Sequence, residues 1–157
     1  MNKFICLIGA GLVWAGSAQA ISLTVPKGLI DMAVAKKFPK EKATIAVDKP
    51  TLTLSKARQK VELCGTWVSK LPQASGDFCI DTQPVWNKDT GDIEISKVNI
   101  LKLTTANGKE LPATVANLLN ATVLTLLDGT PIYRVPDMIG KRLNGIEVQD
   151  GGIRLNF

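Results

Sequence analysis

Residues 111–127, LPATVANLLNATVLTLL, form a stretch of 17 residues without a single charged side chain. Apolar residues recur in it at helical spacing, which predicts a helix over 113–127 with a length of about 22 Å. A helix that is apolar all round lies in a membrane or inside a protein. A membrane span needs about 20 apolar residues, and Asn117, Asn120 and three threonines interrupt this stretch. We therefore expect a helix enclosed by protein.

Residues 1–20 have the composition of a secretory signal peptide. Lys3 supplies a positive start, residues 4–14 are apolar, and Ala18-Gln19-Ala20 is a small-x-small cleavage site. Cleavage is expected to leave a single domain over 21–157. No cysteine follows the apolar segment, so the domain is expected in the periplasm, secreted across the inner membrane without a lipid anchor. Its net charge, +5 before Lys3 is removed, does not require a nucleic-acid partner.

Cys64 and Cys79 remain after the signal peptide removes Cys6, and an oxidising compartment favours a disulfide between them. They lie in VELCGTWV (61–68) and DFCIDTQPVW (77–86), which alternate like the strands of a hairpin. Placing Cys64 opposite Cys79 pairs Leu63 with Ile80 on an apolar face of the sheet. The same register places Glu62 opposite Asp81 on the polar face, where nearby lysines would have to screen the two carboxylates.

Shorter elements are expected on both sides of this hairpin. The predicted elements are a helix from Pro26 to Phe38, a strand over 44–54 with an edge or bulge at Pro50, a strand from Asp92 with a bulge near Ser96-Lys97, a strand over 131–135, and a hairpin over 145–157. The order helix, strands, helix, strands predicts an α+β fold with an antiparallel sheet.

No combination of residues forms a recognisable catalytic or metal centre. The chain contains no histidine, the usual general base near neutral pH. The Glu62–Asp81 pair is expected to stay solvated on the polar face rather than to work as an acid–base pair. Cys64 and Cys79 lack the C-x-x-C spacing of redox-active pairs, so a structural disulfide is favoured. We predict a protein that is not an enzyme and that has no metal or other cofactor.

The turn at NKDTG (87–91) suggests an alternative to the prediction that no metal is bound. Asp89, Asp92 and Glu94 lie close together in the sequence and could hold a calcium ion. Their spacing does not match the EF-hand loop, and turn chemistry explains Asp89 and Gly91 equally well. The prediction that no metal is bound is therefore kept.

A basic cluster, Lys36, Lys37, Lys40 and Lys42, follows the first predicted helix. It could make peripheral contact with the anionic surface of a membrane, where each basic residue contributes about 1 kcal/mol. The alternative is a solvated helix end whose lysines complement the helix dipole. Both interpretations stay open, and the second requires no partner.

The order of these segments resembles a known family. The segments are AKKFP (35–39), PVWNKDTGDIEISKVNI (84–100), GTPIYRV (129–135) and the closing GIEVQDGGIRLNF (145–157). Together they resemble the DUF1439 family of YceB-like bacterial envelope proteins. That resemblance covers nearly all of 21–157 and implies a strongly curved antiparallel sheet wrapped around a long apolar helix, with a shorter N-terminal helix. This arrangement is similar to tubular lipid-binding domains of the TULIP or SMP type, and the family has no assigned reaction.

Together the residues and the resemblance suggest an apolar ligand site between the helix and the curved sheet. The predicted groove consists of Leu63, Phe78, Ile80, Trp86, Ile93, Ile95, Val115, Leu118, Leu119 and Leu126. A groove lined by such residues would bind a lipid or another apolar small molecule. If the same residues instead form a closed core, the protein would be a structural or protein-interaction component of the cell envelope.

Overall fold

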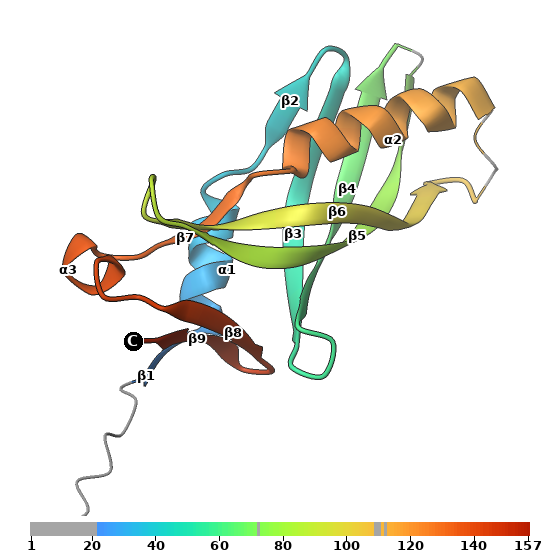
Figure 1. The fold of residues 1–157 in the computed structure, drawn as a ribbon. Coiled ribbons are helices and arrows are strands. Elements are labelled where there is room, and N and C mark those ends of the chain that lie inside the picture. Colours follow the sequence, from blue (N-terminus) through green and yellow to red (C-terminus); the bar gives the residue numbers. More distant parts are fainter. Residues whose placement is uncertain (1–21, 72, 109–110, 112) are drawn as a thin grey trace, which may run out of the picture.

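The computed structural model describes residues 22–71, 73–108, 111 and 113–157 (Figure 1). Strands account for 55% of the structure and helices for 21%, so the fold is mostly β. The prediction of an α+β fold, with a strongly curved sheet wrapped around a long apolar helix, is therefore wrong. The predicted signal peptide lies outside the described residues.

Six antiparallel strands form the larger sheet, which curves into a half-barrel (Figure 1). In sheet order the strands are β2 (Lys40–Lys42), β3 (Ile45–Ser55), β4 (Lys60–Lys70), β5 (Gln73–Asn87), β6 (Asp92–Thr105) and β7 (Pro131–Arg134). The predicted hairpin corresponds to β4 and β5, and its register is confirmed, with Glu62 opposite Asp81 and Leu63 opposite Ile80. The predicted disulfide between Cys64 and Cys79 is also present.

Two predicted irregularities in this sheet are confirmed. The β3–β4 register shifts between Asp48 and Thr51, so Pro50, which has no N–H to donate, lies at a break in the ladder. In β6, Lys97 has a φ of 50°, and the register with β5 shifts nearby, between Asp81 and Gln83. A bulge of this kind changes which side chains face the core. Ile93 and Ile95 are buried before it, whereas Val98 and Ile100 turn inward after it, up to a second register shift between Cys79 and Ile80.

A smaller, three-stranded sheet joins the two ends of the described chain (Figure 1). Its strands, in sheet order, are β1 (Ser22–Pro26), β9 (Gly152–Asn156) and β8 (Gly145–Gln149). The β8–β9 hairpin was predicted, but its pairing with β1 was not. Helix α1 (Lys27–Ala35) buries Ile30 and Val34 and contacts both sheets. A single helical turn, α3 (Asp137–Gly140), precedes β8.

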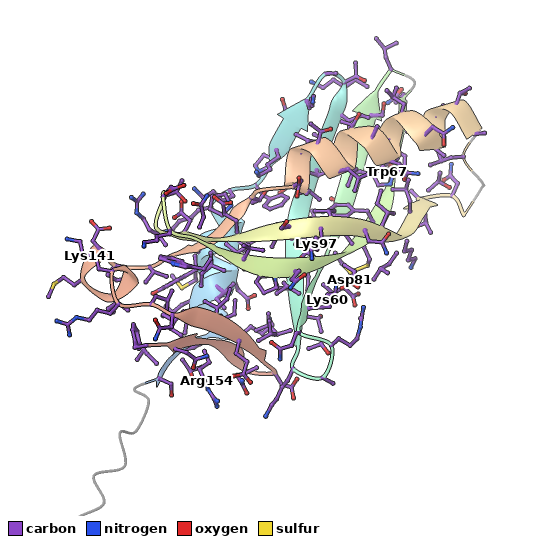
Figure 2. The ribbon with its side chains drawn as sticks, viewed as in Figure 1. Lys60, Trp67, Asp81, Lys97, Lys141 and Arg154 are labelled. Carbon is purple, nitrogen blue, oxygen red and sulfur yellow. A yellow bond between two sulfur atoms is a disulfide. The ribbon has the colours of Figure 1, made fainter. Side chains whose placement is uncertain are left out.

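Strand side chains fill the inside of the half-barrel. Trp67, labelled in Figure 2, is fully buried together with Phe78, Ile80 and Ile93. The indole Nε1 of Trp67 donates a hydrogen bond to the carbonyl oxygen of Thr104, 3.0 Å away, so its one polar group is satisfied. These large side chains leave no room for a helix in the centre, which is the physical reason why the wrapped-helix prediction fails.

Helix α2 (Ala113–Leu127) has the predicted bounds but lies across the half-barrel, where it contacts β2 and β3 near one edge of the sheet and β6 near the other (Figure 1). It buries one stripe, Leu119, Val123 and Leu127, whereas Leu118 is 57% exposed. Its exposed face carries no charged side chain, and its polar side chains there are threonines and Asn117. No helix among the described residues is long and apolar enough to cross a membrane.

Candidate ligand-binding groove

The residues predicted to line a groove separate into two groups. Leu63, Phe78, Ile80, Ile93, Ile95 and Leu119 are at most 1% exposed and belong to one continuous core. The other four do not gather at one place, because Trp86 lies at the end of β5, while Val115, Leu118 and Leu126 belong to α2. Six of the ten predicted residues therefore pack against protein rather than line an open surface.

The open surface lies elsewhere, along the seam between α2 and β6. One hollow of about 450 Å³ is lined by side chains from residues 100–105 of β6, by Leu111 and Gly108, and by Ala116 and Asn120 of α2. A second hollow, of about 550 Å³, is lined by residues 96–98 of β6 and by Leu124, Thr125 and Asp128. We call these two hollows together the α2–β6 groove.

One face of α2 forms the wall of this groove. Ala116, Asn120 and Leu124 follow one another at intervals of four residues, so they lie on one side of the helix, next to the buried stripe. From Ala116 to Asp128 this side extends for about 18 Å at roughly 1.5 Å per residue. The two hollows therefore follow one another along the same side of the helix, and they share no lining residue.

The floor of the groove is the part of β6 that lies beyond its pairing with β7. Strand β7 pairs with β6 only at residues 92–94, and α2 contacts β6 as well. Ile100, Leu103 and Leu111 are half-buried there and pack against the core, while Leu101 is 49% exposed. Apolar surface therefore continues from the core into the groove.

The sequence-based groove contained none of the residues on this floor. One signal could have indicated them: the alternation of apolar residues in β6 changes phase at Ser96-Lys97, as predicted. That change turns Val98 and Ile100 toward the side where α2 lies. The position of α2 itself could not be read from the sequence.

Asn120 is the unusual side chain of the groove. Its Oδ1 atom is buried, and it accepts no hydrogen bond from any residue that the structure describes. The other polar residues of α2 avoid this problem: Thr122 and Thr125 donate hydrogen bonds of 2.8 Å to the carbonyl oxygens four residues earlier, and Asn117 is exposed. A buried acceptor without a donor is unfavourable for folding.

Of the basic cluster, Lys40 has an intramolecular role. Its Nζ donates a hydrogen bond to Thr130 Oγ1 at 2.9 Å and contacts the carbonyl oxygen of Leu126 at 3.4 Å, at the C-terminal end of α2. Burial, with a smaller contribution from the charge of Lys37, lowers the pKa of Lys40. Lys36, Lys37 and Lys42 are exposed.

The two carboxylates that face each other on the hairpin, Glu62 and Asp81, are not both solvated as predicted. Asp81 is only 7% exposed, not solvated, and Arg58 from the β3–β4 turn forms an ion pair with its Oδ2 atom. Screening therefore comes from an arginine rather than from the lysines that the sequence suggested. The arrangement compensates one buried charge, as a structural ion pair does.

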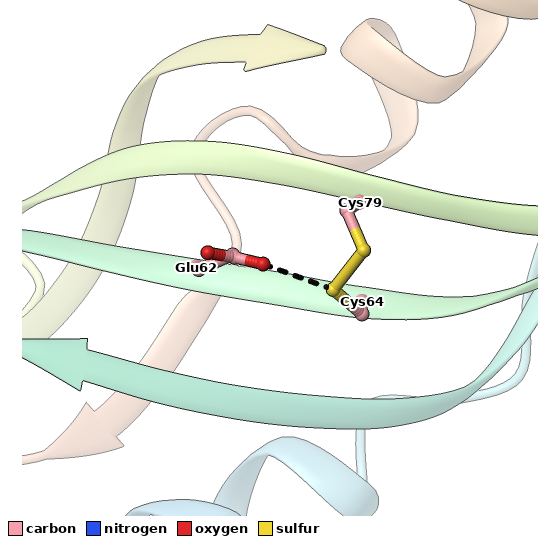
Figure 3. A group of neighbouring side chains, drawn as sticks. All are labelled: Glu62, Cys64 and Cys79. Carbon is pink, nitrogen blue, oxygen red and sulfur yellow. Dashed lines mark hydrogen bonds between the residues drawn. A yellow bond between two sulfur atoms is a disulfide. The ribbon is translucent and has the colours of Figure 1, made fainter. Parts of the chain in front are cut away.

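Glu62, Cys64 and Cys79 lie together on this face (Figure 3). Their possible ligand atoms are within 4.8 Å of one another, a spacing that could suit a metal ion. Both sulfur atoms are joined in the disulfide, however, and thiolates are the form that binds metal. The 3.4 Å contact from Cys64 Sγ to Glu62 Oε1 is a packing contact, since a disulfide sulfur has no hydrogen to donate.

A further hollow of about 270 Å³ lies around Trp86, beside the 88–91 turn and α3. It contains Asp89 from the calcium alternative, but its other charged residues are mostly basic: Lys88, Arg134 and Lys141 oppose Asp89 and Asp137. Such a mixture does not offer the six or more oxygens that a calcium ion takes.

No family model matches the chain, and no curated protein matches it either.

Proposed function

We propose that the protein binds a lipid or another apolar small molecule in the α2–β6 groove, without catalysing a reaction. The observation that carries this proposal is that four apolar side chains, Ile100, Leu101, Leu103 and Leu111, line one hollow beside the face of α2. The groove replaces the sequence-based set of ten residues as the proposed site. The resemblance to the DUF1439 family supports the same class of ligand, and membership of that family is part of this proposal.

The proposed place of action is the periplasm, where the protein is not lipid-anchored. The composition of residues 1–20 and the disulfide, a bond typical of oxidising compartments, support this location. Lys36, Lys37 and Lys42 are exposed and are proposed to contact anionic headgroups during transfer of the ligand. Lys40 is removed from that proposed contact because it binds the end of α2.

A substitution that fills the groove tests the proposal. Ala116→Trp is expected to block the groove, since Ala116 lines it, and to remove the lipid that co-purifies with the wild-type protein. Ala121→Trp is the matched control, because Ala121 is on the exposed face of the same helix and should not affect binding. Native mass spectrometry of protein isolated from bacterial periplasm measures the bound lipid in all three forms.

The competing function is that of a structural or protein-interaction component of the envelope. The closed core formed by six of the predicted groove residues favours it. Wild-type protein that carries no lipid, and that binds none after exposure to bacterial lipid extract, would contradict lipid binding and leave this second function. Equal lipid occupancy in Ala116→Trp and Ala121→Trp would show that the lipid binds outside the α2–β6 groove.

A further inference from the structure

Asn120 gives the α2–β6 groove a chemical preference that its apolar floor lacks. The residue lies in the middle of the helix face that forms the wall, between Ala116 and Leu124. Because this position is in the helix interior, its amide cannot cap a helix end. A leucine or alanine would favour the helix more and would leave no polar atom behind.

The Oδ1 atom of Asn120 therefore has to find a hydrogen-bond donor outside the described protein residues. Oδ1 is buried and accepts no hydrogen bond from them, while the Asn120 residue lines the hollow of about 450 Å³, so a rotation of its side chain would turn the amide toward that hollow. Oxygen and nitrogen of an asparagine amide can exchange places by a simple rotation. The most suitable partner is a group that both donates and accepts, because it would match either orientation.

Resting on the proposed lipid-binding function, we propose that the groove selects apolar molecules that carry a hydroxyl group, such as long-chain alcohols or monoacylglycerols. In this complex the hydroxyl bonds to the Asn120 amide, and the alkyl chain lies along Ile100, Leu103 and Leu111. Asn120 is thus a specificity-determining residue. A carboxylate only accepts hydrogen bonds, so a fatty acid would match only the orientation that presents the amide nitrogen, and it would leave Oδ1 without a donor in the other orientation.

Lys102 provides the alternative for the same groove. It lines the hollow, and its ammonium group could attract the carboxylate of a fatty acid. The side chain is exposed, however, so water and salt weaken that attraction. If the protein binds a fatty acid more tightly than an alcohol, Lys102 rather than Asn120 determines the ligand preference, and the proposed role of Asn120 is wrong.

Three probes of equal chain length separate these outcomes: dodecanol, dodecyl methyl ether and dodecanoate. Binding of each to the delipidated full-length mature protein is measured by NMR titration. Dodecanol is expected to bind about tenfold more tightly than the ether, which has lost only the donor, as one hydrogen bond of ordinary strength predicts. Asn120→Leu should reduce the affinity for dodecanol about tenfold and leave that for the ether unchanged.

Two further variants control this experiment. Asn117→Leu makes the same change on the exposed part of α2 and should alter no affinity. Asn120→Ser keeps a group that donates and accepts, so it should retain a preference for the alcohol over the ether. Asn120→Leu is expected to unfold at a temperature no lower than the wild type, because it removes an unsatisfied polar atom.

The results distinguish this proposal from the one on which it rests. If the ether and the alcohol bind equally, and Asn120→Leu changes neither, lipid binding stands and the hydroxyl preference is wrong. If none of the three probes binds the wild-type protein, both proposals are wrong.

Discussion

At the scale of single residues, the polar face of the hairpin shows how the fold tolerates a buried carboxylate. Asp81 is nearly buried and lies opposite Glu62, so two negative charges face each other across the strands. Arg58, which is half-exposed, supplies the opposite charge from the β3–β4 turn, 23 positions before Asp81. Removal of one partner from such a pair leaves an uncompensated charge in the protein.

Arg58→Ala is expected to lower the free energy of unfolding by about 1–2 kcal/mol, less than for a fully buried pair because the arginine is partly in water. Arg154→Ala is the control, since its 3.8 Å pair with Glu147 is exposed on both sides and should contribute below about 1 kcal/mol. Urea unfolding measures both variants. An equal loss in the two would show that Arg58 does not compensate Asp81.

At the scale of elements, α2 can face water without charges because its threonine hydroxyls bond to its own backbone and its asparagine at 117 is exposed. Its last turn is contacted from outside by Lys40, whose Nζ atom lies near a carbonyl oxygen that the helix end leaves without a helical partner. Lys40, which was predicted to contact a membrane surface, therefore contacts the C-terminal end of α2 instead.

The lowered pKa of Lys40 predicts a dependence of stability on pH. As the pH rises from that lowered pKa toward the ordinary value of 10.5, folded protein releases the proton first and the unfolded chain holds more protons. Stability contributed by Lys40 therefore increases with pH in this alkaline window. Urea unfolding at several pH values should show the wild type gaining stability relative to Lys40→Met, whereas the exposed Lys42→Met should follow the wild type. A constant difference between wild type and Lys40→Met would contradict this linkage.

Helices and strands whose pattern is set by residues close together in the chain could be predicted from the sequence. The cysteine pair and the alternation around it indicated the β4–β5 register, and the uncharged stretch indicated the bounds of α2. Packing between distant segments could not be predicted. Nothing local in Ser22–Pro26 indicates a strand that pairs with Gly152–Asn156, and nothing in α2 indicates that Trp67 already occupies the centre of the half-barrel. Because the position of α2 could not be predicted, the sequence-based groove consisted mainly of core residues, whereas the hollows of the structure lie between α2 and β6.

At the scale of the whole molecule, one covalent link joins two central strands of the half-barrel. The disulfide closes a loop between Cys64 and Cys79, which are 15 positions apart, on the face opposite the packed side chains of Leu63 and Ile80. Its contribution is therefore expected to come mainly from restriction of the unfolded chain rather than from packing.

Replacement of both cysteines by alanine should lower the free energy of unfolding by about 3 kcal/mol and leave the β-sheet signal in circular dichroism unchanged. Reduced wild-type protein is the control and should lose a similar amount. Thiol titration of denatured, unreduced wild-type protein that lacks residues 1–20 should find no free cysteine, because Cys64 and Cys79 are joined. An unchanged stability of the double variant would show that the loop closure contributes nothing.

The pairing of β1 with β9 has a consequence for how the chain is made. The first described strand can find its partner only when the last one has been synthesised, so the smaller sheet is the latest part of the molecule to close. Contacts between such distant positions also form slowly. The first described strand therefore stays without its partner until Gly152–Asn156 have been made, a timing compatible with the proposed secretion of the protein before it folds.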